Sequence, residues 1–422
     1  MQKVIYNRMR WMMPFGYFEY PHVPRVLAES RGFPIGVRSV VLVGGGIAGL
    51  YAAYLIKKRL PGVKYTIIEK APRCGGRVAM SKVGDVKVPT GAHFMRVDKD
   101  KTLGNLLRDL GFRIRPRLLE MDYTFEKPDP GRMISRLRSG MKKHDRSKSS
   151  FRDFGKKVLG DDYERLVDIM GYTDFEAADF VDTIENYGLD DNMPGYRIHD
   201  VDWDDLVERL VEEVGRGNII TNTEVKSIKG HGDGYIVNSK WKCDGVILAT
   251  TVGQLRKLLD NPVYDGIQSQ EFLKVFARVK GVAIENYTVV DCNLRKVVPI
   301  GGGVCTVAFA DNEDAIELNK RNKSYFEGAL SAQFKGDVKL SGVKKFFWEE
   351  GTHYYKPLSK RYKSRRQFIH EAQHPGANMW VVGEMVAEKQ GWVEGALTSV
   401  EKISLFGSTT QSRESRLLLK NR

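Results

Sequence analysis

The chain has 422 residues, of which 42% are hydrophobic and 28% charged, a composition that is ordinary for a soluble globular protein. This length can bury a substantial core and indicates two interleaved domains. The net charge of +14 favours anionic partners and disfavours cationic ones, and no stretch approaches the roughly 18 apolar residues that a membrane span needs.

The cysteines indicate neither a metal site nor a disulfide framework. Cys74, Cys243, Cys292 and Cys305 are scattered without Cys-x-x-Cys spacing. This usage fits a reducing, cytoplasmic setting best, which would be the host cytoplasm if the protein is viral.

Residues 1–37 form an N-terminal extension rich in aromatic residues, Met and Pro, without clear periodicity. Its short apolar stretch from Trp11 to Phe18 is interrupted by Pro14 and Gly16 and has no small-residue cleavage site, which argues against a secretory signal. A mitochondrial presequence is the alternative interpretation of this segment. The sequence assigns no role to the extension.

The first regular elements predict a βαβ unit. Ser39 to Val43 is a short β-branched run, a helix is expected from Ile47 to Leu60, and Tyr65 to Ile68 forms a second strand. The turn between the first strand and the helix carries Gly44, Gly46 and Gly49, with Ile47 and Ala48 between the last two. Such a turn binds a dinucleotide pyrophosphate at the helix N-terminus. Glu69, twenty residues past Gly49, is placed to accept hydrogen bonds from the adenosine ribose.

The remainder of the chain alternates between nucleotide-domain and other segments. Residues 128–160 are a basic, Ser- and Gly-containing stretch with little hydrophobic content, Asp202 to Val214 reads as an amphipathic helix, and residues 259–350 alternate like antiparallel sheet. Strand-like runs are also expected at 218–221, 224–228, 245–250 and 380–382, with a helix over 391–405. We therefore expect a discontinuous nucleotide-binding domain over 38–127, 200–258 and 367–410, a substrate-binding domain over 128–199 and 259–366, and a basic tail over 411–422.

The segment from Glu69 to Arg77 has the pattern E-x-x-x-R-x-G-G-R. It resembles the second signature of the flavin amine oxidase superfamily, which includes monoamine, polyamine and L-amino acid oxidases. The resemblance implies a Rossmann-like FAD-binding domain of the p-hydroxybenzoate hydroxylase and amine oxidase type, interleaved with an α+β substrate domain. It also assigns cofactor contacts to Lys70, Arg73, Gly75, Gly76 and Arg77.

Three later segments extend the resemblance. Residues 89–94 resemble the family segment beside the flavin ring, which implies roles for Gly91, Ala92 and His93; Thr90 is a minor departure. Val225 matches the backbone that grips the adenine. The C-terminal flavin motif is matched by Gly383, Glu384, Trp392, Val393 and Ala396. Because residues 367–384 contain no cysteine that could link the flavin, the FAD is expected to be non-covalent.

The candidate catalytic residues also follow from the resemblance. Lys274, in the apolar run 272–276, matches the strand on which many family members carry a lysine that holds a water against flavin N5. A lysine on the solvent face of a strand is the simpler alternative. His93 lies beside the ring, and Tyr354 and Tyr355, with Trp348, are candidates for the aromatic wall of the substrate cavity.

The reaction that the resemblance implies removes hydride from the carbon next to an amine and delivers it to flavin N5. Imine hydrolysis and reoxidation by dioxygen, which gives hydrogen peroxide, complete it. The basic charge favours a substrate carried on phosphate. The compact chain is also similar in kind to flavin amine oxidases of bacteriophages that process amino-acid-modified thymines, and this resemblance implies a substrate amine or amino-acid group on a modified base in DNA, which would have to be flipped out of the duplex. The candidate DNA contacts are Arg136, Arg138, Lys142, Lys143, Lys360, Arg361, Lys363, Arg365 and Arg366. An oxidase of a free small amine or amino acid, a non-catalytic flavin-binding or nucleic-acid-binding component, and a desaturase are the alternatives.

Overall fold

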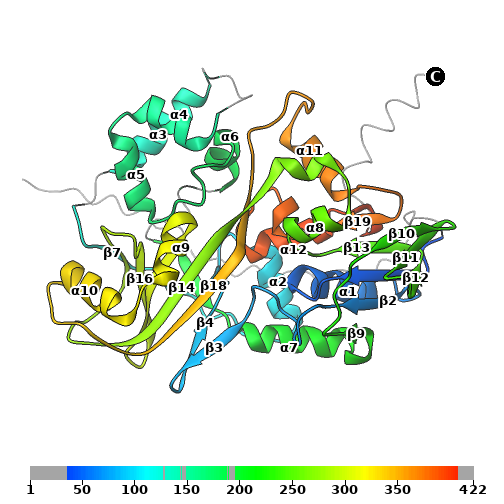
Figure 1. Ribbon diagram of the computed structural model, residues 1–422, viewed down its shortest axis with the longest axis horizontal. Helices are drawn as coiled ribbons and strands as arrows, with labels where there is room; N and C mark the ends of the chain where they lie inside the picture. Colours follow the sequence, from blue (N-terminus) through cyan, green and yellow to red (C-terminus); the bar gives the residue numbers. More distant parts are fainter. Residues whose placement is uncertain are drawn as a thin grey trace, which may run out of the picture.

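A computed structural model describes residues 36–126, 129–142, 144, 149–187, 189 and 195–406. The N-terminal extension up to residue 35, the tail from residue 407 and Lys143 lie outside the described residues. The structure has a nucleotide domain and a substrate domain that exchange segments along the chain (Figure 1). Within the described ranges, no helix combines the length and apolarity that crossing a bilayer requires.

A parallel sheet with strand order β19-β13-β1-β2-β9 is the centre of the nucleotide domain. Its strands form because short β-branched and apolar runs are buried on both faces, as expected for parallel sheets. The strands are β1 (Ser39–Val43), β2 (Lys64–Ile68), β9 (Ile219–Ile220), β13 (Gly245–Leu248) and β19 (Met379–Val381).

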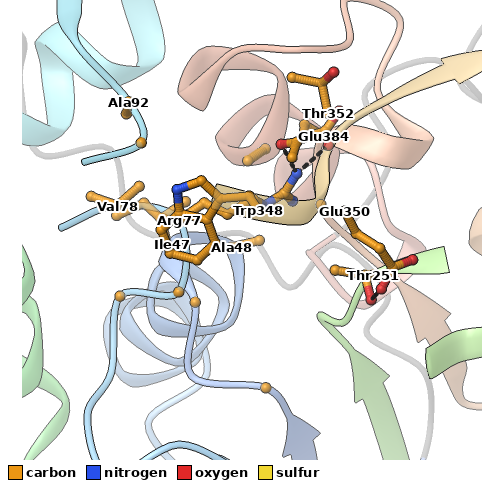
Figure 2. A pocket seen from close by; sticks show the side chains of 18 of the residues that line it. Ile47, Ala48, Arg77, Val78, Ala92, Thr251, Trp348, Glu350, Thr352 and Glu384 are labelled. Carbon is orange, nitrogen blue, oxygen red and sulfur yellow. Dashed lines mark hydrogen bonds and ion pairs between the residues drawn. The ribbon is translucent and has the colours of Figure 1, made fainter. Parts of the chain in front are cut away.

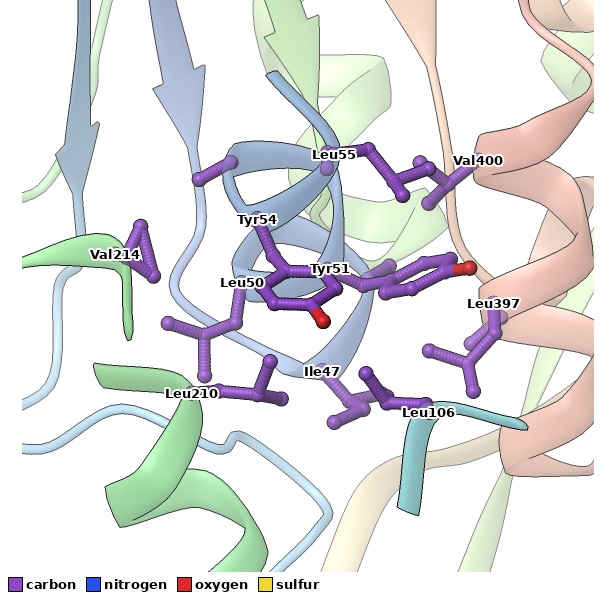
Figure 3. Packing of buried hydrophobic residues seen from close by; sticks show 14 of the residues in the cluster. Ile47, Leu50, Tyr51, Tyr54, Leu55, Leu106, Leu210, Val214, Leu397 and Val400 are labelled. Carbon is purple, nitrogen blue, oxygen red and sulfur yellow. The ribbon is translucent and has the colours of Figure 1, made fainter. Parts of the chain in front are cut away.

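Helix α1 (Ile47–Arg59) packs on one face of this sheet and is surrounded by other helices (Figure 3). Leu210 and Val214 of α7 (Trp203–Val214), Leu106 of α2 (Lys101–Asp109), and Leu397 and Val400 of α12 (Val393–Glu401) converge on it. Because α1 is buried nearly all round rather than on one stripe, its sequence has apolar residues in every turn.

The opposite face of the sheet is covered by a small antiparallel sheet and two helices. They are β10 (Ile228–His231), β11 (Gly234–Val237), β12 (Trp241–Cys243), α8 (Val252–Leu258) and α11 (Arg365–Gln373). Short 3₁₀ turns complete the domain: η3 (Arg216–Asn218), η5 (Glu384–Val386) and η6 (Ser404–Phe406). The run 224–228 is not a strand over most of its length, because β10 begins only at Ile228.

The substrate domain contains a mixed sheet of order β18-β14-β17-β16-β15-β7. Antiparallel pairing was expected over residues 259–350, and the structure confirms it for the strands but not for residues 312–320 and 323–334, which are helical. Helices α9 and α10 pack against this sheet. The elements are β7 (Met121–Tyr123), β14 (Ile267–Lys280), β15 (Tyr287–Val289), β16 (Lys296–Gly301), β17 (Val304–Asp311), β18 (Lys339–Tyr355), α9 (Asn312–Lys320), α10 (Lys323–Phe334) and the 3₁₀ turn η4 (Pro262–Gly266). Since β7 pairs with β15, the chain joins the substrate sheet before residue 128.

Two small sheets lie where the domains meet. One is the hairpin of β3 (Met80–Val83) and β4 (Val86–Pro89), and the other has order β5-β8-β6, from β5 (Phe94–Arg96), β6 (Arg117–Leu118) and β8 (Arg197–Asp200). The second sheet joins residues about a hundred positions apart and brings the ring of His93 next to that of Phe309 in the substrate domain.

The basic stretch 128–160 differs from its expected character, because its described part is mostly helical and contributes to a core. Asp129 and Ser150 cap the N-termini of α3 (Pro130–Met141) and α4 (Phe151–Leu159). The few apolar residues recur at helical spacing and are buried against α5 (Asp162–Met170), α6 (Phe180–Asp182) and the π-helical turn η1 (Thr183–Tyr187). The charged residues occupy the outer faces.

Arg365 ties this helical insert to the start of α11. Its guanidinium pairs with Asp182 at 2.6 Å and Asp179 at 3.4 Å, and its side chain is only 12% exposed. The Asp179 carboxylate also accepts the backbone N–H of Leu358, just after β18. We expect Arg365→Met to cost about 3–5 kcal/mol of unfolding free energy, because it leaves two buried carboxylates without their cation.

Urea or thermal unfolding measures this cost. Arg366→Met is the matched control, since the neighbouring arginine is 82% exposed and should contribute under about 1 kcal/mol. Equal effects of the two substitutions would contradict the role given to Arg365.

Candidate active site

A cavity of about 640 Å³ runs between the two domains at the carboxyl ends of β1, β2 and β13. All of the predicted cofactor residues line it except Gly49 and Arg73. Ligands of open α/β sheets bind at this edge, and the volume is in the range of about 300–1,000 Å³ that cofactor sites occupy.

The glycine turn after β1 leaves space only where a ligand would approach. Gly44 has φ +104°, and a Cβ there would lie 2.4 Å from the carbonyl oxygen of Ala249. A Cβ on Gly49 would lie 2.0 Å from the carbonyl oxygen of Gly44, so Gly49 serves helix–strand packing and not ligand contact. A Cβ on Gly46 would meet nothing within 4 Å. The open side of Gly46, at the N-terminus of α1, therefore fits a pyrophosphate.

Glu69 lies at the end of β2 with both carboxylate oxygens on backbone N–H groups. Gly45 donates to Oε2 at 2.6 Å and Ala71 donates to Oε1 at 2.8 Å. Glu69 is 8% exposed and lines the cavity. Each carboxylate oxygen can accept a further hydrogen bond, so these contacts leave room for the ribose contact expected from the sequence.

Arg73 and Arg77 flank the paired glycines but differ in position. The guanidinium of Arg73 donates to the carbonyl oxygens of Cys74 at 2.9 Å and Gly76 at 3.2 Å, so it fixes the turn from outside the cavity. Arg77 lines the cavity and donates to the carbonyl of Gly351 and to Oε1 of Glu384 at 2.8 and 2.7 Å (Figure 2).

Glu384 is the centre of a buried cluster that the sequence did not reveal in full. Its carboxylate contacts Arg77, the Nδ1 atom of His353 and the backbone N–H of Gly391. Burial alone would raise its pKa, but His353 and Arg77 outweigh burial and lower the pKa of Glu384 to about 2. His353 had no sequence signal, since it stands in an aromatic and basic run with no motif around it.

Lys274 is fully buried beside the cavity, which rules out the solvent-face alternative. Its Nζ atom donates to the carbonyl oxygens of Gly91 at 2.8 Å and Pro89 at 3.3 Å. Gly91 lines the cavity, and the Nζ atom lies 4.7 Å from the ring centroid of Phe309, another lining residue. Burial lowers the pKa of Lys274 to about 7, so a large fraction of the amine is neutral at physiological pH.

The aromatic wall differs from the expected one. Trp348 lines the cavity, with its indole N–H donating to the carbonyl of Thr90 at 3.1 Å. Tyr355 was expected there, but its side chain is buried in the nucleotide-domain core and its hydroxyl donates to Ala387. Tyr354 is also absent from the residues that line this cavity. Among the lining residues that sequence reasoning missed are Tyr172, Asp174, Phe309 and Phe347.

The candidate DNA-binding residues are dispersed, and several are in ion pairs. Arg136 pairs with Asp162, Arg361 with Glu371 and Arg366 with Glu388. Arg365 is buried between Asp179 and Asp182. The side chains of the other described candidates, Arg138, Lys142, Lys360 and Lys363, are exposed.

The depressed pKa of Glu384 predicts a pH-dependent contribution to stability. Because the folded pKa is about 2 and the ordinary value is 4.5, the stabilisation is fully present above about pH 4.5 and is lost as the pH falls towards 2. The difference corresponds to about 3 kcal/mol. In urea unfolding at a series of pH values, Glu384→Gln should lack this dependence.

Glu388→Gln is the control, since Glu388 is half-exposed and makes only surface ion pairs. A stability difference between wild type and Glu384→Gln that stayed constant from pH 2.5 to 5 would contradict the buried cluster around Glu384.

Comparisons with known proteins agree with this architecture. Residues 42–110 match the family described as NAD(P)-binding Rossmann-like domain, and residues 136–291 match the family described as flavin containing amine oxidoreductase. Coproporphyrinogen III oxidase of Bacillus subtilis (strain 168) is 31% identical over 80 residues, which are 18% of this chain and 17% of that protein.

Solved structures of amine oxidases share the fold. Putrescine oxidase bound to putrescine has a TM-score of 0.71 at 16% identity, over 86% of this chain and 97% of that one. Cyclohexylamine oxidase from Brevibacterium oxydans IH-35A has a TM-score of 0.70 at 13% identity, over 87% and 97% of the two chains. The chain therefore shares the fold of these amine oxidases, and residues 136–291 match the flavin containing amine oxidoreductase family, in agreement with a glycine turn that fits a dinucleotide.

Proposed function

We propose that this protein is an FAD-dependent oxidase of a free amine. The observation that carries the proposal is the continuity of the cavity. It extends from the Gly46 turn to an aromatic end beside Lys274, which we call the reaction chamber. The rings that line this chamber are those of Tyr172, Phe272, Phe309 and Trp348. A dinucleotide that fits the turn would extend its flavin ring towards that chamber, where an amine can be held against it.

FAD would supply the electron-accepting ring, to which the hydride of the amine-bearing carbon passes. The protein orients the reactants and excludes water. The turn at Gly46 and the N-terminus of α1 would hold the pyrophosphate. Phe272, Phe309 and Trp348 form an apolar wall that excludes water. The side chain of Lys274 donates a hydrogen bond to the Gly91 carbonyl. In this position it would place its own neutral amine group, or a water bound to it, near the reacting carbon.

The chamber favours a substrate that arrives as a cation. Asp174 is 8% exposed and lines the chamber with the rings of Tyr172 and Phe309. A carboxylate attracts an ammonium group strongly at low dielectric, and aromatic faces add cation–π attraction. Small mono- and diamines therefore fit the chamber better than anionic groups do.

An amine carried on a modified DNA base is the second candidate. This candidate is supported by the net charge of +14 and by four exposed basic residues, Arg138, Lys142, Lys360 and Lys363. It receives less support because Arg136, Arg361, Arg365 and Arg366 are in ion pairs with acids of the same chain. For either substrate, we propose dioxygen as the electron acceptor.

Gly46→Val tests the cofactor site. Its Cβ would enter open space and its backbone (φ −69°, ψ 178°) suits any residue, so the fold should be unchanged while the side chain occupies the pyrophosphate space. We expect loss of the yellow flavin spectrum and at least a hundredfold weaker FAD binding, measured by fluorescence titration.

Gly62→Val is the matched control, because a Cβ at Gly62 also meets nothing within 4 Å but the residue lies outside the cavity. FAD binding by Gly46→Val equal to that of Gly62→Val would refute the placement of the cofactor.

Anaerobic mixing with small amines tests the reaction and Lys274. Amines should bleach the flavin of the wild type, and Lys274→Met should slow bleaching or reoxidation about a hundredfold, the usual size of an acid–base contribution. A titration near pH 7 in the wild type should be absent from the variant. Methionine is apolar and similar in length, so the variant should fold.

Lys345→Met is the control, because Lys345 lies on β18 and donates only to carbonyls of Asn319 and Arg321. Unchanged bleaching and reoxidation in Lys274→Met would remove Lys274 from the mechanism. Bleaching by amine-bearing duplex DNA, with none by any free amine, would replace the proposed substrate with the second candidate.

A further inference from the structure

A smaller cavity of about 100 Å³ lies next to the reaction chamber, between the sheet β5-β8-β6 and strands β15 and β16. Its lining is polar, with Arg117, Glu120, Glu285 and Asn286. His93 lines both cavities, so at this point the wall between them is one side chain thick. A volume of this size holds a few water molecules, at about 30 Å³ each, and excludes FAD.

A pair of tyrosine hydroxyls forms another link between the cavities. Tyr172 lines the reaction chamber and Tyr287 lines the small cavity. Their hydroxyl oxygens are 3.3 Å apart, and either can be the donor. Phe309 packs edge-on against Tyr172 at 5.4 Å between ring centroids, which fixes the ring that faces the chamber.

Amine oxidation requires a proton to leave the chamber. A small amine is an ammonium ion in neutral solution, whereas hydride leaves the carbon next to a neutral amine. Once the amine fills an apolar chamber, its proton has no water to receive it there. The proton must leave through protein groups, or else the amine must lose it before binding.

We propose that the paired hydroxyls of Tyr172 and Tyr287 carry the proton of the substrate ammonium from the reaction chamber to the small polar cavity. This inference rests on the proposed amine oxidase function. The proton of the ammonium N–H bond passes to the oxygen of Tyr172, the Tyr172 proton passes to the oxygen of Tyr287, and the Tyr287 proton passes to water in the small cavity. The products are a neutral amine, two intact phenols and a hydronium ion, so charge and atoms balance.

The groups around the pair favour a coordinated transfer over a tyrosinate. Burial raises the pKa of Tyr287, so its anion is not populated near neutrality. The Nζ atom of Lys296 lies 2.7 Å from the ring centroid of Tyr172, is fully buried and has no hydrogen-bond partner among the described residues. Burial lowers the pKa of Lys296 well below its usual value, which disfavours the charged form that would repel the proton.

Other titratable and charged groups around the pair come from several elements. Asp174 and Asp311 interact electrostatically with Lys296, and both attract positive charge towards this wall. Burial, with Lys274 and Arg117, holds the pKa of His93 well below its usual range. Tyr123, on β7, interacts electrostatically with Tyr287, and burial raises the pKa of Tyr123. The hydroxyls of Tyr172 and Tyr287 are within hydrogen-bond distance of each other and belong to residues that line different cavities, so we assign the transfer to this pair.

Stopped-flow mixing with a pH-indicator dye tests the path. The FAD-loaded protein is mixed with tert-butylamine, which has no hydrogen on the carbon next to nitrogen and therefore binds without being oxidised. The change in the flavin spectrum reports binding and the dye reports proton release. In the wild type, release should follow binding, whereas in Tyr172→Phe and Tyr287→Phe it should lag at least tenfold and reach the same final amount.

Tyr264→Phe is the matched control, because Tyr264 is fully buried, its hydroxyl makes a hydrogen bond to Ala372, and it lines neither cavity. Release as fast in both pair variants as in Tyr264→Phe would overturn the path, as would an amine that binds without releasing a proton in the wild type. Failure of every oxidisable amine to bleach the flavin would instead overturn the proposed function, and the path with it.

Discussion

The carboxylate of Glu384 is the interaction on which the rest of the site depends. It joins Arg77 after β2, His353 on β18 and the N–H of Gly391 before α12, which lie far apart in the sequence. An unpaired carboxylate at this depth would cost several kcal/mol, so the segments must assemble together. The same contacts bring the paired-glycine turn, the strand of the aromatic wall and the C-terminal motif to one cavity.

The sequence predicted the parts of the site that depend on local geometry. A short β-branched strand, a glycine turn and an acid at the end of the next strand determine one another's positions within about thirty residues, so Gly44, Gly46 and Glu69 lie as expected. The helix expected over 202–214 and the strand at 245–250 also formed, because each has an uninterrupted apolar pattern. The expected fold class, a Rossmann-like domain interleaved with an α+β domain, was also confirmed, because these local patterns recur along the chain.

The parts that the sequence could not predict depend on contacts between distant segments. Tyr172 and Asp174 come from a loop after α5 that has no periodicity, and only tertiary packing brings them to the chamber. Tyr355 does not line the cavity because this end of β18 is buried in the nucleotide-domain core. Arg365 was interpreted as surface charge because its partners Asp179 and Asp182 are more than 180 residues away.

Strands β14 and β18 pair along nearly their whole lengths, from Ile267 opposite Tyr355 to Lys280 opposite Lys339 (Figure 1). One end of this ribbon is buried in the nucleotide-domain core and the other in the substrate-domain core. Hinge closure of two domains needs a few unpaired residues that can absorb a change in backbone angles. The pairing is irregular between Gln270 and Phe272 and between Phe276 and Arg278, and bending anywhere else along the ribbon would break several backbone hydrogen bonds at once. The paired ribbon therefore links the two cores on either side of the cavity, and any change in the angle between the domains has to be absorbed at these two irregularities.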